Sequence, residues 1–275
     1  MAEQELPLRG LLIDLDGTVY HGHRMIDGAD KLIRMLQDKQ LPYLFVTNNS
    51  TATPGVVAER LQAMGIPAQA QDVCTSAQAA ASYMADNHPN GRVFAIGEEG
   101  LQTALIEAGL QLVEENPDIV VQGMDREFTF SRMAQAVRFL LAGASYVLTN
   151  PDRLLPTAEG FMPGAGSLSA MLQAASGIEP TVIGKPSAIL MDFALNKLGL
   201  KAEEAWVIGD NPMTDIAAGH AAGCKSVLVL TGLATPHNYQ QLLEAAGCTA
   251  DVVLEDLHSL HTYIGDKLAS HQLTP

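Results

Sequence analysis

Residues 11–18 read LLIDLDGT, a short apolar run that leads directly into two aspartates, a glycine and a threonine. The run predicts a buried strand over residues 11–15. Residues i and i+2 of an extended chain point to the same side, so Asp14 and Asp16 are expected to face the mouth beyond the strand's carboxyl end. Open α/β sheets bind their ligands there. Aspartate and glycine are also common in turns, so a plain turn is the alternative reading of this segment.

Further short runs rich in Val, Ile and Leu alternate with helical patterns along the chain. This alternation is typical of βαβ units around a buried parallel sheet, so the predicted fold class is α/β with a doubly wound, Rossmann-like core. Strands are expected over 11–15, 43–47, 72–75, 181–183, 205–208, 226–230 and 251–254, and a second set over 92–96, 118–121 and 145–149. Helices are expected over 27–40, 54–64, 76–87, 98–108, 131–141, 168–175, 187–198, 213–222 and in a last segment that ends at 268.

The second set of strands predicts a second domain. The chain has 275 residues, and at about 150 residues per domain two domains are expected. We therefore predict a discontinuous core, residues 1–80 and 180–275, interrupted by an inserted α/β cap domain, residues 81–179.

Composition limits the classes of partner. Apolar residues make up 47% of the chain, enough to bury a core, and 16 basic against 31 acidic residues leave a formal charge of −15. This charge disfavours nucleic-acid polymers and anionic membranes. The cysteines, Cys74, Cys224 and Cys248, are too few and too far apart for a disulfide framework, which fits a reducing cytoplasm. Export and membrane spanning are not expected, because the sequence has no apolar leader and no run of about 18 apolar residues.

Three more predicted strands end in residues suited to an anionic ligand. Residues 47–50 read TNNS and precede a helix, as in a phosphate cradle, although a local hydroxyl turn or helix cap is the alternative. Lys185 lies between a strand and a helix, where it is either a cation aimed into the mouth or a solvated surface lysine. Residues 207–215 read VIGDNPMTD, with Asp210 at the strand end and Asp215 in the following helix as a loop brace or only a cap. All four segments fall at one edge of one sheet, which indicates a single site.

In this order, the DxDGT strand, the strand ending in Thr47, the lysine before a helix and the GDNxxTD loop resemble the haloacid dehalogenase-like superfamily of phosphohydrolases. The resemblance covers nearly the whole chain. The sequences TNNS at 47–50, TNPD at 149–152 and GKP at 184–186 resemble its NagD or p-nitrophenyl phosphatase branch, whose caps are large inserted α/β domains.

The resemblance implies roles for the acidic residues. Asp14 would be the nucleophile that forms an aspartyl-phosphate, and Asp16 would protonate the leaving oxygen and then activate water. Mg²⁺ would be held by the Asp14 carboxylate, the Asp16 backbone carbonyl and Asp210. The phosphate would be bound by Asp16, Thr47, Asn48 and Lys185, with Asn211 and Asp215 in support.

The expected protein is thus a cytoplasmic, Mg²⁺-dependent phosphatase of small phosphomonoesters, such as a nucleotide or sugar phosphate, with p-nitrophenyl phosphate as an artificial substrate. Phosphotransfer to another acceptor, as in a mutase, and a non-catalytic phosphometabolite-binding module are the alternatives. The cap is expected to select the leaving group through residues 149–152 and 153–166, and a homo-oligomer is left open. His21 and His23 suggest a metal pair, but no third ligand has suitable spacing, so solvated loop histidines are the preferred interpretation.

Overall fold

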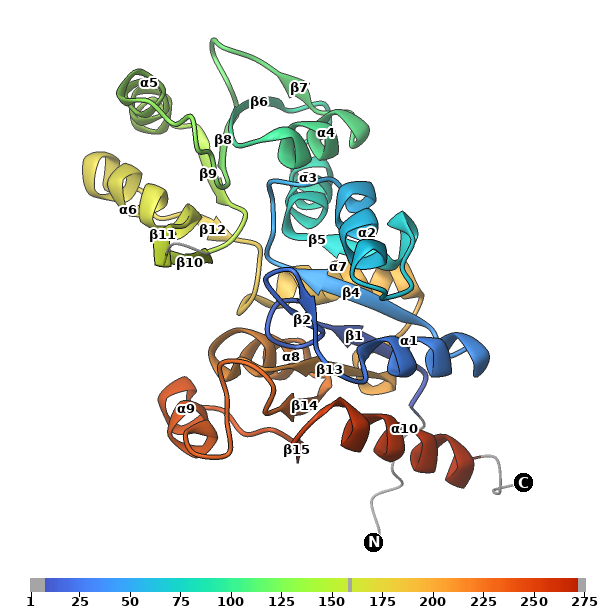
Figure 1. Cartoon of the computed structure of the whole chain (residues 1–275). Helices are drawn as coiled ribbons and strands as arrows, with labels where there is room; N and C mark the ends of the chain where they lie inside the picture. Colours follow the sequence, from blue (N-terminus) through green and yellow to red (C-terminus); the bar gives the residue numbers. More distant parts are fainter. Residues whose placement is uncertain (1–7, 158–159, 272–275) are drawn as a thin grey trace, which may run out of the picture. The chain divides into compact units, whose positions relative to one another are not determined.

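The computed structural model describes residues 8–157 and 160–271 (Figure 1). Its main sheet has six strands in the order β15-β14-β13-β1-β4-β5. The strands are β1 (Gly10–Ile13), β4 (Tyr43–Thr47), β5 (Val73–Thr75), β13 (Ala205–Gly209), β14 (Lys225–Val229) and β15 (Val252–Leu254). Numbered among themselves along the chain, they run 3-2-1-4-5-6, the order of a doubly wound sheet. The strand order therefore reverses between β1 and β13.

The two strands at this reversal are buried along their whole length. Every residue of β1 and of β13 is buried, as expected of apolar strands that are covered on both faces. They pair in parallel, with Leu11 opposite Trp206 and Ile13 opposite Ile208. This register brings the residues that follow the two strands to the same edge of the sheet.

Helices and a small hairpin complete the part of the chain around this sheet. Helix α1 packs against α10, and α9 packs against the turn Pro212–Ile216. Leu242 and Leu243 of α9 lie against a buried cluster of Ile216, Leu228 and Ala234. A two-stranded hairpin, β2 (Tyr20–His21) and β3 (Arg24–Met25), follows β1 directly. The helices are α1 (Ala29–Asp38), α2 (Pro54–Ala63), α7 (Ala188–Leu198), α8 (Ala217–Ala222), α9 (Tyr239–Ala246) and α10 (Leu257–His271).

The chain forms two compact units. The first takes in the residues up to Val46, Ala58–Val73 and the residues from Met191 on, and the second takes in Thr47–Val57 and Cys74–Leu190. The second unit has its own five-stranded parallel sheet in the order β12-β9-β8-β6-β7 and a hairpin of β10 and β11. Its elements are α3 (Ser76–Asn87), β6 (Arg92–Ile96), α4 (Glu99–Glu107), β7 (Gln111–Leu112), β8 (Ile119–Gln122), α5 (Phe130–Leu141), β9 (Ser145–Leu148), β10 (Leu154–Thr157), β11 (Gly160–Pro163), α6 (Ala165–Ser176) and β12 (Thr181–Val182).

The predicted α/β class is confirmed, and each expected strand and helix has a counterpart within a few residues of its expected bounds. The expected helix over 213–222 is the least regular, because it begins as a π-helical turn, Pro212–Ile216, before α8. Strands β2, β3 and β7 were not predicted, since two-residue strands are too short to show a period. The hairpin of β10 and β11 was not predicted either, because its segment is rich in proline and glycine and reads as a loop. The predicted boundaries of core and cap stay a prediction. Residues 47–57, which were assigned to the core, group with the second unit.

Candidate active site

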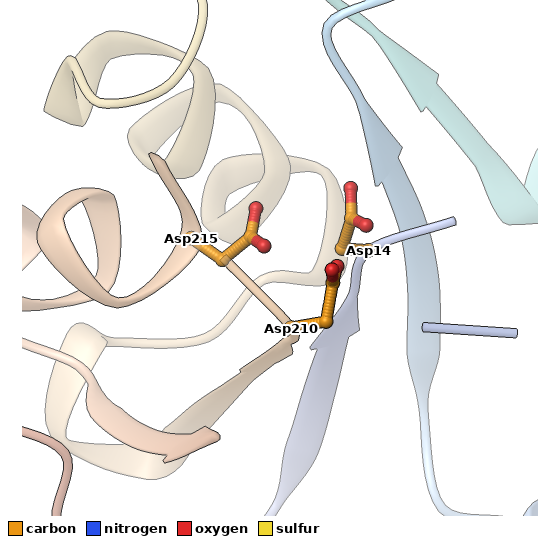
Figure 2. A group of neighbouring side chains, drawn as sticks. All are labelled: Asp14, Asp210 and Asp215. Carbon is orange, nitrogen blue, oxygen red and sulfur yellow. The ribbon is translucent and has the colours of Figure 1, made fainter. Parts of the chain in front are cut away.

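Three carboxylates gather at the point where the strand order reverses. Asp14 follows β1, Asp210 follows β13 and Asp215 lies in the π-helical turn, and an oxygen of each lies within 4.8 Å of the others. Figure 2 shows the side chains of Asp14 and Asp210 rising beyond the tips of the two strand arrows, with Asp215 directed towards them. Doubly wound sheets bind their ligands at this reversal, beyond the carboxyl ends of the strands.

The backbone of the sheet fixes the first pair. Because Ile13 lies opposite Ile208, the Asp14 N–H donates to the Ile208 carbonyl over 2.8 Å. Asp210 comes two residues after Ile208, directly beyond the end of the neighbouring strand β13. Their proximity is therefore set by the parallel register itself, and each strand contributes one carboxylate at its end.

Asp210 is buried, with 4% of the residue exposed, and its carboxylate is held from two sides. The backbone N–H of Leu233 donates to Oδ2 over 2.6 Å. The Thr18 hydroxyl lies 3.1 Å from Oδ1 of Asp210 and 3.3 Å from Oδ2 of Asp14. A hydroxyl has one proton to donate, so Thr18 bridges the two carboxylates without neutralising either.

Asp215 has two roles. It is 1% exposed, and its Oδ2 accepts a hydrogen bond of 3.1 Å from the Asn211 N–H, which braces the loop as the sequence suggested. Its membership of the carboxylate cluster was not predicted. Asn211 caps the π-helical turn, since its side-chain oxygen accepts from the Met213 N–H over 3.0 Å.

Asp16 is not a member of the cluster, and the residue keeps part of its surface exposed. Partial burial of its carboxyl raises its pKa, whereas the neighbouring His21 and backbone N–H groups of Gly17 and Gly22 act in the opposite direction. His21 is exposed, as expected of a loop histidine, but it is engaged in the structure. Its Nε2 lies 2.7 Å from the Thr231 carbonyl, which can only accept, so Nε2 carries the proton.

In the second unit, the side chain of Asn48 forms a clasp on Lys185. Its Oδ1 accepts from the Lys185 N–H over 2.8 Å, and its Nδ2 donates to the Lys185 carbonyl and to Asp152 Oδ2, each over 3.1 Å. Lys185 is 3% exposed, so the reading of a solvated surface lysine is wrong. Thr47 forms the local turn that the sequence left open, because its hydroxyl oxygen accepts from the Asn49 N–H over 3.1 Å.

The predicted site residues thus fall into two sets. The acidic residues lie in the first unit, and Thr47, Asn48 and Lys185 lie in the second. The expectation that all four segments end strands of one sheet is wrong for Lys185, because the strand before it, β12, pairs with β9 in the sheet of the second unit. Sequence reasoning missed the Thr231–Leu233 loop, and it placed Asp152 in the cap segment 149–152 without predicting its contact with Asn48. The loop follows the strand predicted over 226–230. Its threonine and glycine, at a strand end like the four motif segments, were the signal that could have pointed to it.

Replacing Asn48 with alanine is expected to destabilise the fold by about 2–4 kcal/mol, because it leaves the N–H and carbonyl of Lys185 without the clasp. Thermal or urea unfolding of the full chain measures the change. The matched control is Asn87→Ala, which removes a single exposed bond of 2.7 Å to the Tyr83 carbonyl. Equal losses of stability in the two variants would contradict the clasp.

The donor set of the carboxylate cluster fits a hard divalent cation. It offers oxygen atoms only, and Mg²⁺ and related ions are bound by carboxylates, often with water and phosphate completing the shell. Three like charges within 4.8 Å of one another also repel unless a cation lies near them.

Comparisons with known proteins agree with this geometry. Residues 11–111 match a family described as haloacid dehalogenase-like hydrolase, and residues 182–260 match one described as HAD-hydrolase-like. The 5'-nucleotidase YutF of Bacillus subtilis is 43% identical over 225 residues, which cover 82% of this chain and 88% of that protein. An acid sugar phosphatase of Staphylococcus epidermidis is 43% identical over 230 residues, 83% of this chain and 89% of that protein. The solved p-nitrophenyl phosphatase from Archaeoglobus fulgidus superposes with a TM-score of 0.88 at 36% identity, covering 94% of this chain and 99% of that one.

The chain belongs to the haloacid dehalogenase-like hydrolases. Within that family it is a phosphoric monoester hydrolase, and the predicted resemblance to the NagD or p-nitrophenyl phosphatase branch is confirmed. Phosphatases of this family use a divalent metal, and the acidic cluster is suited to hold one. None of the described helices is both long and apolar enough to span a membrane.

Proposed function

We propose that the chain is a Mg²⁺-dependent phosphatase that hydrolyses small phosphomonoesters, such as nucleotides or sugar phosphates, through an aspartyl-phosphate on Asp14. The observation that carries the proposal is the cluster of Asp14, Asp210 and Asp215 at the reversal of the strand order. Relatives named for nucleotide, sugar phosphate and p-nitrophenyl phosphate hydrolysis support small esters as the substrate class.

In the first step, an oxygen of Asp14 attacks phosphorus, and the bond between phosphorus and the ester oxygen breaks. The leaving oxygen takes a proton from Asp16. Partial burial raises the pKa of Asp16, which favours the protonated form that an acid needs. Asp14 is only partly buried, so substrate can reach it from the mouth of the sheet.

In the second step, Asp16 is a carboxylate and takes a proton from water, whose oxygen attacks the phosphorus of the aspartyl-phosphate. Inorganic phosphate leaves, and the Asp14 carboxylate is restored. One residue thus acts first as acid and then as base, which is why two aspartates with different surroundings suit the reaction.

The cation would be held by Asp14, Asp210 and Asp215, with the backbone carbonyl of Asp16 as a further ligand. When bound, it supplies positive charge that offsets the repulsion between the carboxylates and a phosphate dianion. Mg²⁺ is the proposed ion because it is held by few carboxylates and keeps room for water and phosphate.

Lys185, the Thr47 hydroxyl and the backbone N–H of Asn48 are proposed to bind the phosphate oxygens, where phosphoryl transfer gains most from positioning and charge. The clasp of Asn48 on Lys185 supports a joint role for these two residues. We assign the choice of leaving group to the cap, through residues 149–152 and 153–166. Of the latter segment, residues 158–159 lie outside the described part of the chain.

We assign the chain to the cytoplasm, a location that its acidic charge and sparse cysteines fit. Its proposed partner is a small phosphorylated metabolite rather than a nucleic acid or membrane. Homo-oligomers can be tested by light scattering.

An assay with p-nitrophenyl phosphate separates the three candidate functions. A hydrolase releases one inorganic phosphate for every p-nitrophenol. A phosphotransferase or mutase releases less phosphate than p-nitrophenol when an acceptor alcohol is present, and a binding module releases neither.

Replacing Asp16 with asparagine is expected to lower kcat about 10²–10⁴-fold, because general acid–base catalysis contributes about that much. The rate of the first step should fall more for an alkyl phosphate than for p-nitrophenyl phosphate, because p-nitrophenolate leaves without needing a proton. Pre-steady-state p-nitrophenol release, compared with phosphate release from an alkyl ester, measures the difference. If the rate of the first step falls by the same factor for both esters, Asp16 is not the acid.

A further inference from the structure

The loop that follows β14, Thr231–Leu233, surrounds the carboxylate of Asp210. Its Leu233 N–H donates to Asp210 Oδ2 over 2.6 Å, the shortest of the bonds described to that side chain. The next residue reinforces the contact, since the Ala234 N–H donates to the Asp210 carbonyl over 3.0 Å. The loop therefore holds both the backbone and the side chain of Asp210.

Two glycines make room for this carboxylate. A Cβ at Gly232 would lie 2.5 Å from Cγ of Asp210 and 2.7 Å from the Gly17 carbonyl oxygen. A Cβ at Gly17 would lie 2.6 Å from the same Cγ, and Gly17 also has a positive φ of 87° that disfavours other residues. The Asp210 side chain is thus enclosed by backbone of the turn between β1 and β2 on one side and by the loop after β14 on the other.

The loop is tied to the first motif by hydrogen bonds as well as by packing. The Thr231 hydroxyl donates to the Gly17 carbonyl over 2.8 Å, and the Thr231 carbonyl accepts from His21 Nε2 over 2.7 Å. Residues 17 and 21 flank the start of the hairpin β2–β3, so the loop also links that hairpin to the acidic cluster.

We propose that Thr231 and Gly232 are positioning residues that set the orientation of Asp210 for the divalent cation. With Oδ2 bound to Leu233, Oδ1 beside Thr18 and glycine backbone around the carboxylate, Asp210 has a single orientation before the ion arrives. Such outer contacts of a metal ligand contribute about 10–100-fold to metal affinity. The inference rests on the proposed function in so far as Asp210 is taken as a ligand of the cation.

The direct test is Gly232→Ala in the full chain, with Mg²⁺ binding measured by calorimetry. We expect the dissociation constant for Mg²⁺ to rise about 10–100-fold, because the added methyl group displaces the Asp210 carboxylate. The matched control is Gly265→Ala in α10, where a Cβ meets no atom within 4 Å and φ is not positive. The control should bind Mg²⁺ as the wild-type chain does.

A second pair of variants keeps the test decisive if Gly232→Ala fails to fold. Thr231→Val removes the hydroxyl that holds the Gly17 carbonyl and should weaken Mg²⁺ binding, whereas Thr231→Ser keeps the hydroxyl and should bind as the wild type does. Melting temperatures without added metal show whether each variant is folded. A merely structural role of the threonine would lower the melting temperature of Thr231→Val without changing its affinity for Mg²⁺.

Unchanged Mg²⁺ affinity in folded Gly232→Ala, or in Thr231→Val where the former does not fold, would overturn the inference. This result can be told apart from a failure of the proposed function. A wild-type chain that binds Mg²⁺ but hydrolyses no phosphomonoester contradicts the proposed function and leaves the binding comparison intact. A wild-type chain that hydrolyses them while the variants bind Mg²⁺ normally contradicts the inference alone.

Discussion

Replacing Asp14 with asparagine is expected to reduce phosphatase activity on the order of 10⁵-fold, to the background of the assay. The amide has nearly the shape of the carboxylate, but it carries no charge and its oxygen is a poor nucleophile. Release of p-nitrophenol measures the loss. Acid-quenched samples of the wild type, incubated with a ³²P-labelled ester, should contain a protein-bound phosphate that the variant lacks.

Two further measurements separate the loss of the nucleophile from a loss of fold. Asp86→Asn makes the same chemical change on an exposed residue of α3 and should keep full activity. Without metal, Asp14→Asn should melt no lower than the wild type, because it removes one of three carboxylates that lie within 4.8 Å of one another. Two unit charges about 4 Å apart repel by roughly 4 kcal/mol at an effective dielectric constant near 20. Substantial turnover by folded Asp14→Asn would contradict the assignment of the nucleophile.

The part of the site that could be predicted is the part that the sheet register determines. An apolar run followed by an aspartate identifies a strand end, and parallel strands place their ends at one edge, so Asp14 and Asp210 could be expected to lie together. Every residue of β1 and β13 is buried, so both strands are apolar runs that are easy to recognise in the sequence. The order of strands adds the reversal point, which the sequence alone does not contain.

The remainder depends on contacts between segments far apart in sequence. Nothing near Asn48 reveals that its amide pairs with the backbone of Lys185, 137 residues away. The contact between Gly232 and Asp210 is likewise invisible, because a glycine after a strand is ordinary in a loop until its neighbour is known. Helix α9 was missed although it has eight residues, since the segment before it reads as a proline-containing loop. Local sequence pattern thus predicts which charged residues lie at strand ends. The contacts that orient their side chains come from distant segments and cannot be read from that pattern.

Removal of divalent cations is expected to abolish turnover of the wild-type chain and to lower its melting temperature. After dialysis against EDTA, activity should fall more than about 100-fold, because the acidic cluster then repels the phosphate dianion it must receive. Adding Mg²⁺ in excess should restore it. A cation that binds the folded cluster and not the unfolded chain stabilises the fold by about 2.7 kcal/mol at 100 times its dissociation constant, so the melting temperature should rise with Mg²⁺.

The chain itself supplies the control for this last experiment. Asp210→Asn takes a charge from the cluster while keeping the shape of the side chain between Gly17 and Gly232. Its melting temperature should therefore respond much less to Mg²⁺ than that of the wild type, whereas Asp86→Asn should respond fully. Sodium chloride at matched ionic strength distinguishes binding from general screening, which acts on all exposed charges alike. Full activity in excess EDTA, or an equal rise in melting temperature for Asp210→Asn and the wild type, would contradict a cation at these carboxylates.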